Sequence, residues 1–206
     1  MVRKIFCTLI LVLMILPNIC GATEIQSTDY VGDFKFTYPT VKISNTFIET
    51  KINEKIREEV KELFNAAKQP DASTTATMSY EITCDDKNIL SVILTEIVYP
   101  QGAAHPSTFK RALNFDTRTG KLIKQADLKN ISREYAKADY SVKGITRKLK
   151  TYAKENNLML YDNFKELKEF PENFYFDKNF HLHFIFQQYE VAPYAVGTID
   201  FDATLY

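Results

Sequence analysis

The sequence predicts an α+β protein with antiparallel sheets and two main amphipathic helices. Three observations lead to this fold class. Several stretches alternate apolar or β-branched residues with polar ones, which is the period of a β-strand. Short polar turns separate neighbouring stretches, as they do in hairpins of antiparallel strands. Two other stretches repeat their apolar residues at steps of three and four, which is the period of an amphipathic helix.

The N-terminal half of the folded chain, residues 23–100, is expected to contain one helix and several strands. Residues 30–43 are rich in β-branched and aromatic side chains and favour a strand. Residues 45–68 have the helical spacing of apolar residues. Residues 72–99 contain two strand-like runs on either side of a polar turn at residues 85–88, which predicts a hairpin.

The ends of this first helix have recognisable signals. Thr46 and Glu49 have the spacing of a capping box, in which each side chain bonds a free backbone N–H group. Gln69-Pro70-Asp71 is expected to end the helix, because the residue before a proline disfavours helical backbone angles.

The C-terminal half, residues 101–206, follows the same plan. After a loop that runs to residue 106, we expect a hairpin in which Gly120 takes the left-handed conformation that its turn needs. A second helix should follow. Later strands end the chain, and the two halves should pack as one interlocked unit. The expected elements are strands at 109–115 and 121–123, a helix at 131–156, a hairpin of 174–176 with 180–186, and a strand at 198–206.

The first 22 residues have the pattern of a secretory signal peptide. Arg3 and Lys4 precede an apolar run over residues 5–17, which is shorter than the roughly 20 residues of a membrane-spanning helix. Small residues then predict cleavage after Ala22 and a location outside the cytoplasm, in the periplasm, at the cell surface or in the medium. The alternatives are a retained N-terminal anchor and a lipid anchor at Cys20.

Charge and cysteine usage limit the possible partners. Loss of residues 1–22 removes Arg3 and Lys4, so the formal net charge changes from zero to −2. Without a broad basic excess, neither nucleic acid nor an anionic membrane surface is favoured as a partner. Cys84 is then the one cysteine beyond the signal region, so it has no internal disulfide partner and is interpreted as a plain strand residue.

Three histidines are the candidates for chemistry. His181 and His183 lie two residues apart and should share one face of a strand, where they could begin a zinc site that His105 or a carboxylate completes. His105 lies in a loop of small residues and could act as a general base, or it could brace that loop through hydrogen bonds to the backbone. No catalytic or phosphate-binding motif accompanies these histidines, so the sequence predicts no catalytic residue, no metal and no cofactor.

Aromatic residues concentrate near the C-terminus. The chain has 12 Tyr and 15 Phe, and thirteen of these aromatic residues lie within residues 161–206. This is more than one face of a sheet requires. Tyr189 and Tyr194 fall where the strand pattern lapses, so they could contact a protein or a glycan, or they could pack a corner of the fold. Together with His105 they are the predicted partner-binding residues.

Three motifs in the C-terminal half carry a family resemblance. They are Gly102–Pro106; Asn114–Asp116 with Thr119–Lys121 and Asp127–Leu128; and Tyr189–Gly197, which reads Tyr-Glu-Val-Ala-Pro-Tyr-Ala-Val-Gly. In these motifs the chain resembles the RsiV-like domains of unknown function (DUF3298), although Ala103 stands where the family often has a second glycine. Residues 28–100 look like the companion domain that usually precedes them (DUF4163).

The resemblance implies an extracytoplasmic α+β module of bacteria. In a lysozyme-sensing anti-sigma factor the module binds host lysozyme, and in cell-wall enzymes it lies beside a polysaccharide deacetylase domain. The expected function is therefore a non-catalytic binding module for a lysozyme-like protein or a cell-wall glycan such as peptidoglycan. One alternative is a small hydrolase or metal-dependent enzyme that uses His105 with His181 or His183. Another is a structural or assembly protein of the cell envelope.

Overall fold

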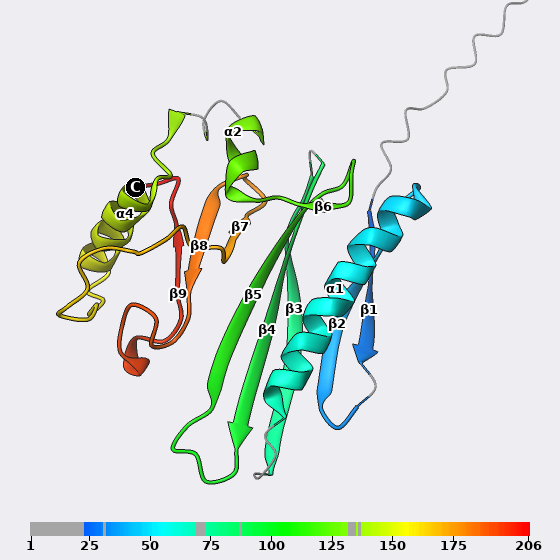
Figure 1. Ribbon diagram of the computed structural model, residues 1–206, viewed down its shortest axis with the longest axis horizontal. Coiled ribbons are helices and arrows are strands. Elements are labelled where there is room, and N and C mark those ends of the chain that lie inside the picture. Colours follow the sequence, from blue (N-terminus) through cyan, green and yellow to red (C-terminus); the bar gives the residue numbers. More distant parts are fainter. Residues whose placement is uncertain (1–22, 31, 69–72, 87, 132–134, 136) are drawn as a thin grey trace, which may run out of the picture.

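The computed structural model describes residues 23–30, 32–68, 73–86, 88–131, 135 and 137–206. Within these residues the chain forms two sheets, one of six strands in the order β1-β2-β3-β4-β5-β6 and one of three strands in the order β7-β8-β9. Figure 1 shows the long helix α1 across one face of the first sheet and the smaller sheet, with helix α4, beside it. The predicted α+β class with antiparallel sheets is confirmed. The predicted signal peptide lies outside the described residues.

The first sheet contains long strands joined mostly as hairpins. Neighbouring strands are antiparallel except β2 and β3, which are parallel because α1 carries the chain back between them. The sheet continues past residue 100, where the sequence predicts the boundary between the two halves. Its elements are β1 (Glu24–Tyr30), β2 (Lys35–Lys42), α1 (Thr46–Ala67), β3 (Thr74–Asp86), β4 (Ile89–Pro100), β5 (Ser107–Asp116) and β6 (Lys121–Leu122).

The structure confirms the first helix and both hairpins of this sheet, and it corrects the first strand. The strand predicted at 30–43 begins only at Lys35, and β1 precedes it as a separate edge strand. Because β1 is mostly polar, its sequence has no clear alternation to reveal it. Gly120 has φ +68°, which is the left-handed conformation predicted for this turn. A Cβ at this position would also lie only 3.2 Å from the Ile48 carbonyl oxygen.

The predicted capping box at Thr46 and Glu49 is wrong. Asn45 is the N-cap, and its Oδ1 accepts hydrogen bonds from the backbone N–H groups of Phe47 and Ile48 at 3.1 and 3.3 Å. Glu49 reaches back beyond the cap, where its Oε2 accepts from the N–H of Ile43 at 3.0 Å. The predicted stop signal at 69–71 lies outside the described residues.

One helix face and one sheet face form the core of this region. The face of α1 that carries Ile52, Ile56 and Val60 is fully buried against the sheet. Alternate residues of β4, among them Leu90 and Leu94, meet it. The core is largely aliphatic.

The second region is built from shorter elements. They are η1 (Gln125–Asp127), α2 (Leu128–Ile131), α4 (Val142–Glu155), β7 (Phe174–Phe176), β8 (Leu182–Phe186), η2 (Tyr194–Val196) and β9 (Ile199–Asp202). The predicted hairpin of β7 and β8 is confirmed, although β8 begins two residues later than expected. The predicted last strand ends at Asp202 rather than Tyr206.

The predicted helix over 131–156 is too long. Asp139, Tyr140 and Ser141 are not helical, and α4 starts after Ser141, whose Oγ accepts from the N–H of Gly144 at 3.1 Å. Gly144 lies so close to Asp139 that an added Cβ would come within 2.2 Å of the Asp139 carbonyl oxygen. The apolar spacing continues through this cap, so periodicity alone does not reveal the interruption.

Aromatic side chains fill the second core. Leu182, Phe184 and Phe186 on one face of β8 are fully buried. Ile145 and Leu149 of α4 and Phe201 of β9 complete this core. On the other face of the second sheet, Ile185 of β8 and Tyr175 of β7 pack against Ile93 and Ala112 of the first sheet.

Side-chain amides join the two regions along the outer edge of β5. Asn173 accepts from the N–H of Ala112 at 2.8 Å and donates to the carbonyl of Lys110 at 2.9 Å. Gln187 accepts from the N–H of Lys110 at 3.0 Å and donates to its carbonyl at 2.7 Å. These amides therefore satisfy the strand edge in the way that a further strand would.

A buried polar chain links the same regions more deeply. Asn114 donates from Nδ2 to the carbonyl of Phe174 at 2.6 Å and accepts from Ser91 Oγ at 2.7 Å, and Ser91 Oγ also accepts from the N–H of Phe176 at 3.3 Å. Both Asn114 and Ser91 are almost completely buried. The position of the second sheet thus depends on a few specific side chains.

Among the described helices, none has both the length and the apolar composition needed to cross a membrane.

Candidate functional site

The loop between β4 and β5 carries His105 at one end of the first sheet. The imidazole is partly exposed, and its Nδ1 lies 3.2 Å from the carbonyl oxygen of Pro106. Its ring stacks on Tyr194, with centroids 3.6 Å apart and an angle of 19° between the planes. The loop is therefore braced by His105, as one of the two sequence-based interpretations expects, and the same ring still reaches solvent.

Tyr189 is held beside this histidine by a tight turn. The N–H of Glu190 donates to the carbonyl of Gln187 at 3.2 Å, and Glu190 Oε2 accepts from the N–H of Gln187 at 2.7 Å. Tyr189 has φ +66° inside this turn, and 55% of the residue is exposed. Its hydroxyl lies 3.2 Å from His105 Nε2.

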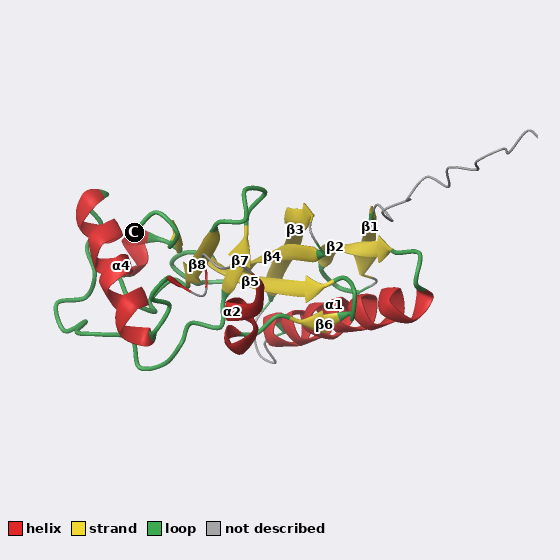
Figure 2. Ribbon diagram, turned by 90° about the horizontal axis from the view of Figure 1, so that it is seen from above, coloured by secondary structure: helices red, strands yellow, loops and turns green. Residues whose placement is uncertain are grey.

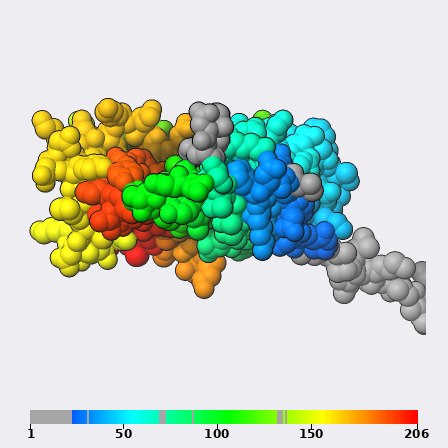
Figure 3. Space-filling view, turned by 90° about the horizontal axis from the view of Figure 1, so that it is seen from below, coloured from blue at the N-terminus to red at the C-terminus, as the bar shows by residue number. Residues whose placement is uncertain are grey.

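Tyr194 approaches the same loop from η2. Its hydroxyl donates to the carbonyl of Pro106 at 3.0 Å, and its ring centroid lies 5.6 Å from that of Tyr189. Val191 and Ala192, between the two tyrosines, are buried and anchor the segment. Figure 3 shows the bright-green loop after β4 directly against the orange-red segment that carries η2.

The structure thus brings together His105, Tyr189 and Tyr194, which we call the aromatic cluster. The sequence identified each residue separately, from a loop of small residues and from a lapse in strand pattern, but it gave no reason to place them in mutual contact. Their role in binding a partner stays a prediction.

The other two histidines lie in a second group, which we call the His–Asp cluster: His181, His183, Asp177, Asp200 and Asp202. His181 Nδ1 is 2.6 Å from Asp202 Oδ2, and His183 Nδ1 is 3.4 Å from Asp200 Oδ1. Asp177 Oδ2 faces both imidazoles, at 4.0 Å from His181 Nδ1 and 3.7 Å from His183 Nε2. The expected common face of the two histidines is confirmed.

The carboxylates of this cluster raise the pKa of His183 and of the neighbouring Tyr175. Burial lowers the pKa of His183, but the hydrogen bond and charge of Asp200, with Asp202 and Asp177, outweigh burial, so the pKa lies above its usual range. Tyr175 donates its hydroxyl to Asp200, and burial followed by that carboxylate raises the tyrosine pKa. The group therefore favours a protonated imidazole among carboxylates.

The two groups occupy different places. β8 runs from the end that carries the His–Asp cluster towards the end that carries the aromatic cluster (Figure 1). No contact between described residues joins His105 to His181 or His183, so the structure does not assemble the three histidines into one site. Within the described ranges, no group of three or more His, Cys, Asp or Glu side chains is arranged to hold a metal ion.

Cys84 lies in β3, as the sequence predicts for a strand residue. The thiol is buried, and burial raises its pKa to about 11. It therefore stays protonated near neutral pH, a form that is a poor nucleophile.

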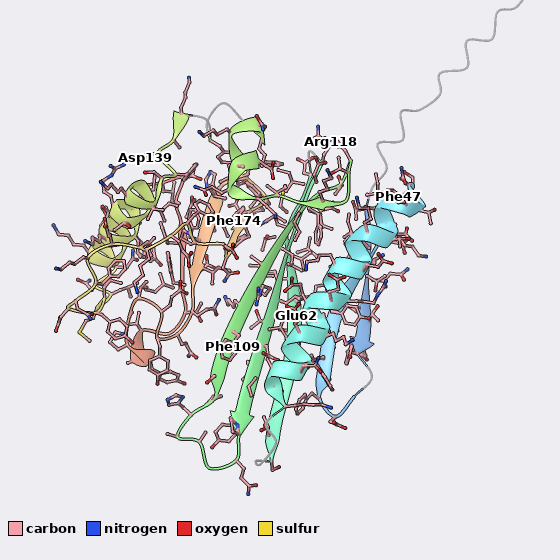
Figure 4. All side chains as sticks on the ribbon, in the orientation of Figure 1. Phe47, Glu62, Phe109, Arg118, Asp139 and Phe174 are labelled. Atoms are coloured by element: carbon pink, nitrogen blue, oxygen red, sulfur yellow. The ribbon has the colours of Figure 1, made fainter. Side chains whose placement is uncertain are left out.

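A groove over β5 has no counterpart in the sequence-based predictions. It has a volume of about 710 Å³, and its lining includes Phe109 and Leu113 of β5, Leu63 of α1, and Phe170 and Phe174 from the second region. Figure 4 shows Phe109 on β5, with Glu62 of α1 to one side and Phe174 towards the other region. The lining comes from segments far apart in the chain, so no local pattern could reveal it.

The sequence-based predictions also missed two buried carboxylates, one in α1 and one in β4. Glu59 lines the groove, pairs with Lys55 at 2.9 Å, and has an Oε2 atom without a hydrogen-bond partner among the described residues. Glu96 is 2% exposed, its Oε1 likewise lacks a partner there, and burial raises its pKa to about 7. The one available signal for Glu96 was its place on the inward face of β4, where the other residues are apolar.

The fold and the two clusters define an α+β protein with two linked sheets and a partly exposed aromatic cluster. Residues 121–204 match the model of the family described as "Protein of unknown function (DUF3298)", so the chain carries a DUF3298 domain over these residues. This confirms part of the predicted resemblance. The specific likeness to the RsiV-like members and the DUF4163-like N-terminal half stay predictions.

Solved structures of DUF3298 family proteins have a similar fold. A DUF3298 family member from Bacteroides fragilis has 14% sequence identity and a TM-score of 0.56, with 89% of this chain and 90% of that chain covered. One from Pseudomonas aeruginosa PAO1 has 12% identity and a TM-score of 0.53, with 88% and 89% covered. No curated protein matches the chain. At these identities the likeness concerns the fold alone.

Proposed function

We propose that the protein is an exported, non-catalytic binding module and that the aromatic cluster is its contact with a partner. The main observation behind this proposal is the backbone conformation and the exposure of Tyr189. A bulky side chain with positive φ is strained, by roughly 1–2 kcal/mol, and this side chain is more than half exposed. Burial therefore offsets little of the strain within the molecule itself.

The chemistry of the cluster suits a protein partner. Tyrosine is enriched at protein interfaces, because its ring gives a large contact area with few rotatable bonds and its hydroxyl can form hydrogen bonds. Stacking on His105 and the bond from Tyr194 to Pro106 hold the rings in place before contact. Such preorganisation reduces the entropy lost on binding.

A lysozyme-like hydrolase is the proposed partner, since the family resemblance includes a lysozyme-binding module. A cell-wall glycan is the second candidate, because partly exposed aromatic rings also present an apolar surface to sugars. The DUF3298 match includes Tyr189 and Tyr194, which supports a family-related role for this surface without identifying the ligand.

Calorimetric titration tests the proposal directly. The purified protein is titrated with lysozymes of several types and, separately, with soluble peptidoglycan fragments. Tyr189→Ala and Tyr194→Ala should each weaken the interaction about tenfold to a hundredfold, as expected for central aromatic residues of an interface. Phe47→Ala, which removes an even more exposed aromatic ring from the start of α1, should leave affinity unchanged.

A second variant separates binding from stability. Asn tolerates positive φ better than Tyr, so Tyr189→Asn should keep or raise the free energy of unfolding, by up to about 1 kcal/mol, while binding is lost. If Tyr189→Asn bound every ligand as tightly as the wild type, the aromatic cluster would not be the contact site.

Export is part of the same proposal. Cleavage after Ala22 would leave every described strand and helix intact, because β1 begins at Glu24. The intact mass of the protein recovered outside the cytoplasm should correspond to a chain that starts at Thr23. A diacylglyceryl adduct on Cys20 would instead indicate a lipid anchor, and a cytosolic product that retains Met1 would contradict export.

A further inference from the structure

The outer face of α4 carries a row of cations. Lys143, Arg147, Lys150 and Lys154 follow one another at steps of four, three and four, and all are exposed. Residues at these steps are neighbours on a helix surface, so like charges repel along the whole row. Lys143 lies in the first turn, where the helix dipole also disfavours a cation.

On the exposed face of helix α1, by contrast, the positive charges are balanced by carboxylates. There, cations and carboxylates are mixed, and Lys55 pairs with Glu58 at 3.4 Å and with Glu59 at 2.9 Å. On α4 one cation of the row forms an ion pair with another described residue, from Arg147 to the exposed Asp139 at 3.4 Å. Since the formal net charge of the whole chain is zero, the row is a local concentration and not a reflection of overall composition.

The row borders a hollow in the surface. The segment after α4 returns past the helix and adds Lys165, so five cations line a hollow of about 720 Å³ together with Glu155 and Glu166. The ammonium of Lys150 donates to the carbonyl of Lys165 and lies 5.7 Å from the centre of the Phe164 ring, which fixes the two walls relative to each other. Figure 2 shows α4 at the far end of the molecule from α1.

We infer that this basic hollow binds a linear, soluble polyanion whose charges are phosphate groups. The row extends over about 16 Å of helix, at 1.5 Å per residue, so a chain of charges matches it better than a single ion does. Arg147 favours phosphate, because its planar guanidinium can donate two parallel hydrogen bonds. The cations lie on both α4 and the returning segment that carries Lys165, and a flexible polymer can bend to contact both.

Fluorescence titration with long-chain inorganic polyphosphate tests the inference. The wild-type protein should bind with an affinity that falls steeply as the salt concentration rises, because Lys and Arg side chains that bind the polymer displace its counterions. Arg147→Gln/Lys154→Gln should weaken binding roughly tenfold at low salt and reduce the slope of log affinity against log salt by about one to two. Lys143→Gln/Lys154→Gln, which retains Arg147 with its partner Asp139, should also weaken binding by several fold.

The matched control is Arg57→Gln/Lys61→Gln, which makes the same change of residue types on the exposed face of α1. It should leave polyphosphate affinity within about twofold, since these positions lie outside the hollow. Equal weakening by the α1 and α4 variants would overturn the inference. So would equal affinity for polyglutamate, or binding to anionic phospholipid vesicles without binding to polyphosphate. Tyr189→Ala should bind polyphosphate normally, so this result and that for the aromatic cluster are independent.

Discussion

The two sheets of this protein form their hydrophobic cores in different ways. In the first, β3 and β4 have 13 and 12 residues, pair along most of their length and bury aliphatic side chains under one long helix. In the second, β7, β8 and β9 have three, five and four residues, and much of the burial comes from phenylalanines. Three such short strands provide few ladder hydrogen bonds, so the second sheet depends on aromatic packing and on its attachment to β5.

The largest expected effect comes from breaking that attachment. Asn114→Ala should lower the free energy of unfolding by about 3 kcal/mol, because it leaves the Phe174 carbonyl and the Ser91 hydroxyl buried without their partner. Native-state hydrogen exchange should show the amides of β8 losing more protection than those of β4.

Asn53→Ala is the matched control within the first sheet. Asn53 accepts from the N–H of Val41 at 2.9 Å and donates to its carbonyl at 2.7 Å, and it is similarly buried. Its loss should weaken the first region. If Asn114→Ala reduced protection equally in both sheets, the second sheet would be no more dependent on its attachment than the first.

A buried carboxylate distinguishes the first region. The pKa of Glu96 rises from 4.5 to about 7 through burial, so its folded form holds a proton that the unfolded form releases. Stability should therefore fall as pH rises from about 4.5 to about 7 and then level off, by about 3 kcal/mol in all. Glu96→Gln should abolish most of this fall and raise stability at pH 8, as measured by urea unfolding. Glu62→Gln, on the exposed face of α1, should do neither.

The second region should respond to pH in a later window and by a smaller amount. His183 has a raised pKa among Asp177, Asp200 and Asp202, so its contribution to stability is complete below about pH 6.5 and is lost as pH rises through the folded pKa. In a Glu96→Gln background, unfolding between pH 6 and 9 should retain this decline, and adding His183→Gln should flatten it. An unchanged decline would assign it to other groups.

The same contrast explains what the sequence could predict. In the first region, long periodic stretches determine long elements, so α1 and the β3–β4 hairpin were predicted within a few residues. In the second, local signals compete: the apolar spacing across residues 138–152 continues over the cap at Ser141, and periodicity gave one helix where the structure has an interruption. The polar edge strand β1 was missed because its two half-buried apolar residues, Ile25 and Tyr30, do not make an alternating pattern.

The candidate site shows the same limit. Composition and spacing identified His105, Tyr189 and Tyr194, because a loop of small residues and a lapse in strand pattern are local signals. Their contact depends on the pairing of β5 with β4 and on the turn at Gln187–Glu190. The groove over β5 and the basic hollow beside α4 each join segments that meet only after folding, so both require the structure.

The amides that cover the edge of β5 also bear on the solubility of the protein. An uncovered strand edge is a template on which a second copy can add its own strand, and such addition leads to aggregates. Here the protection is supplied by Asn173, Gln187 and Gln188, the last through Thr108 at 2.9 Å. A single substitution at one of them would expose part of the edge to intermolecular pairing, even where the fold itself survives.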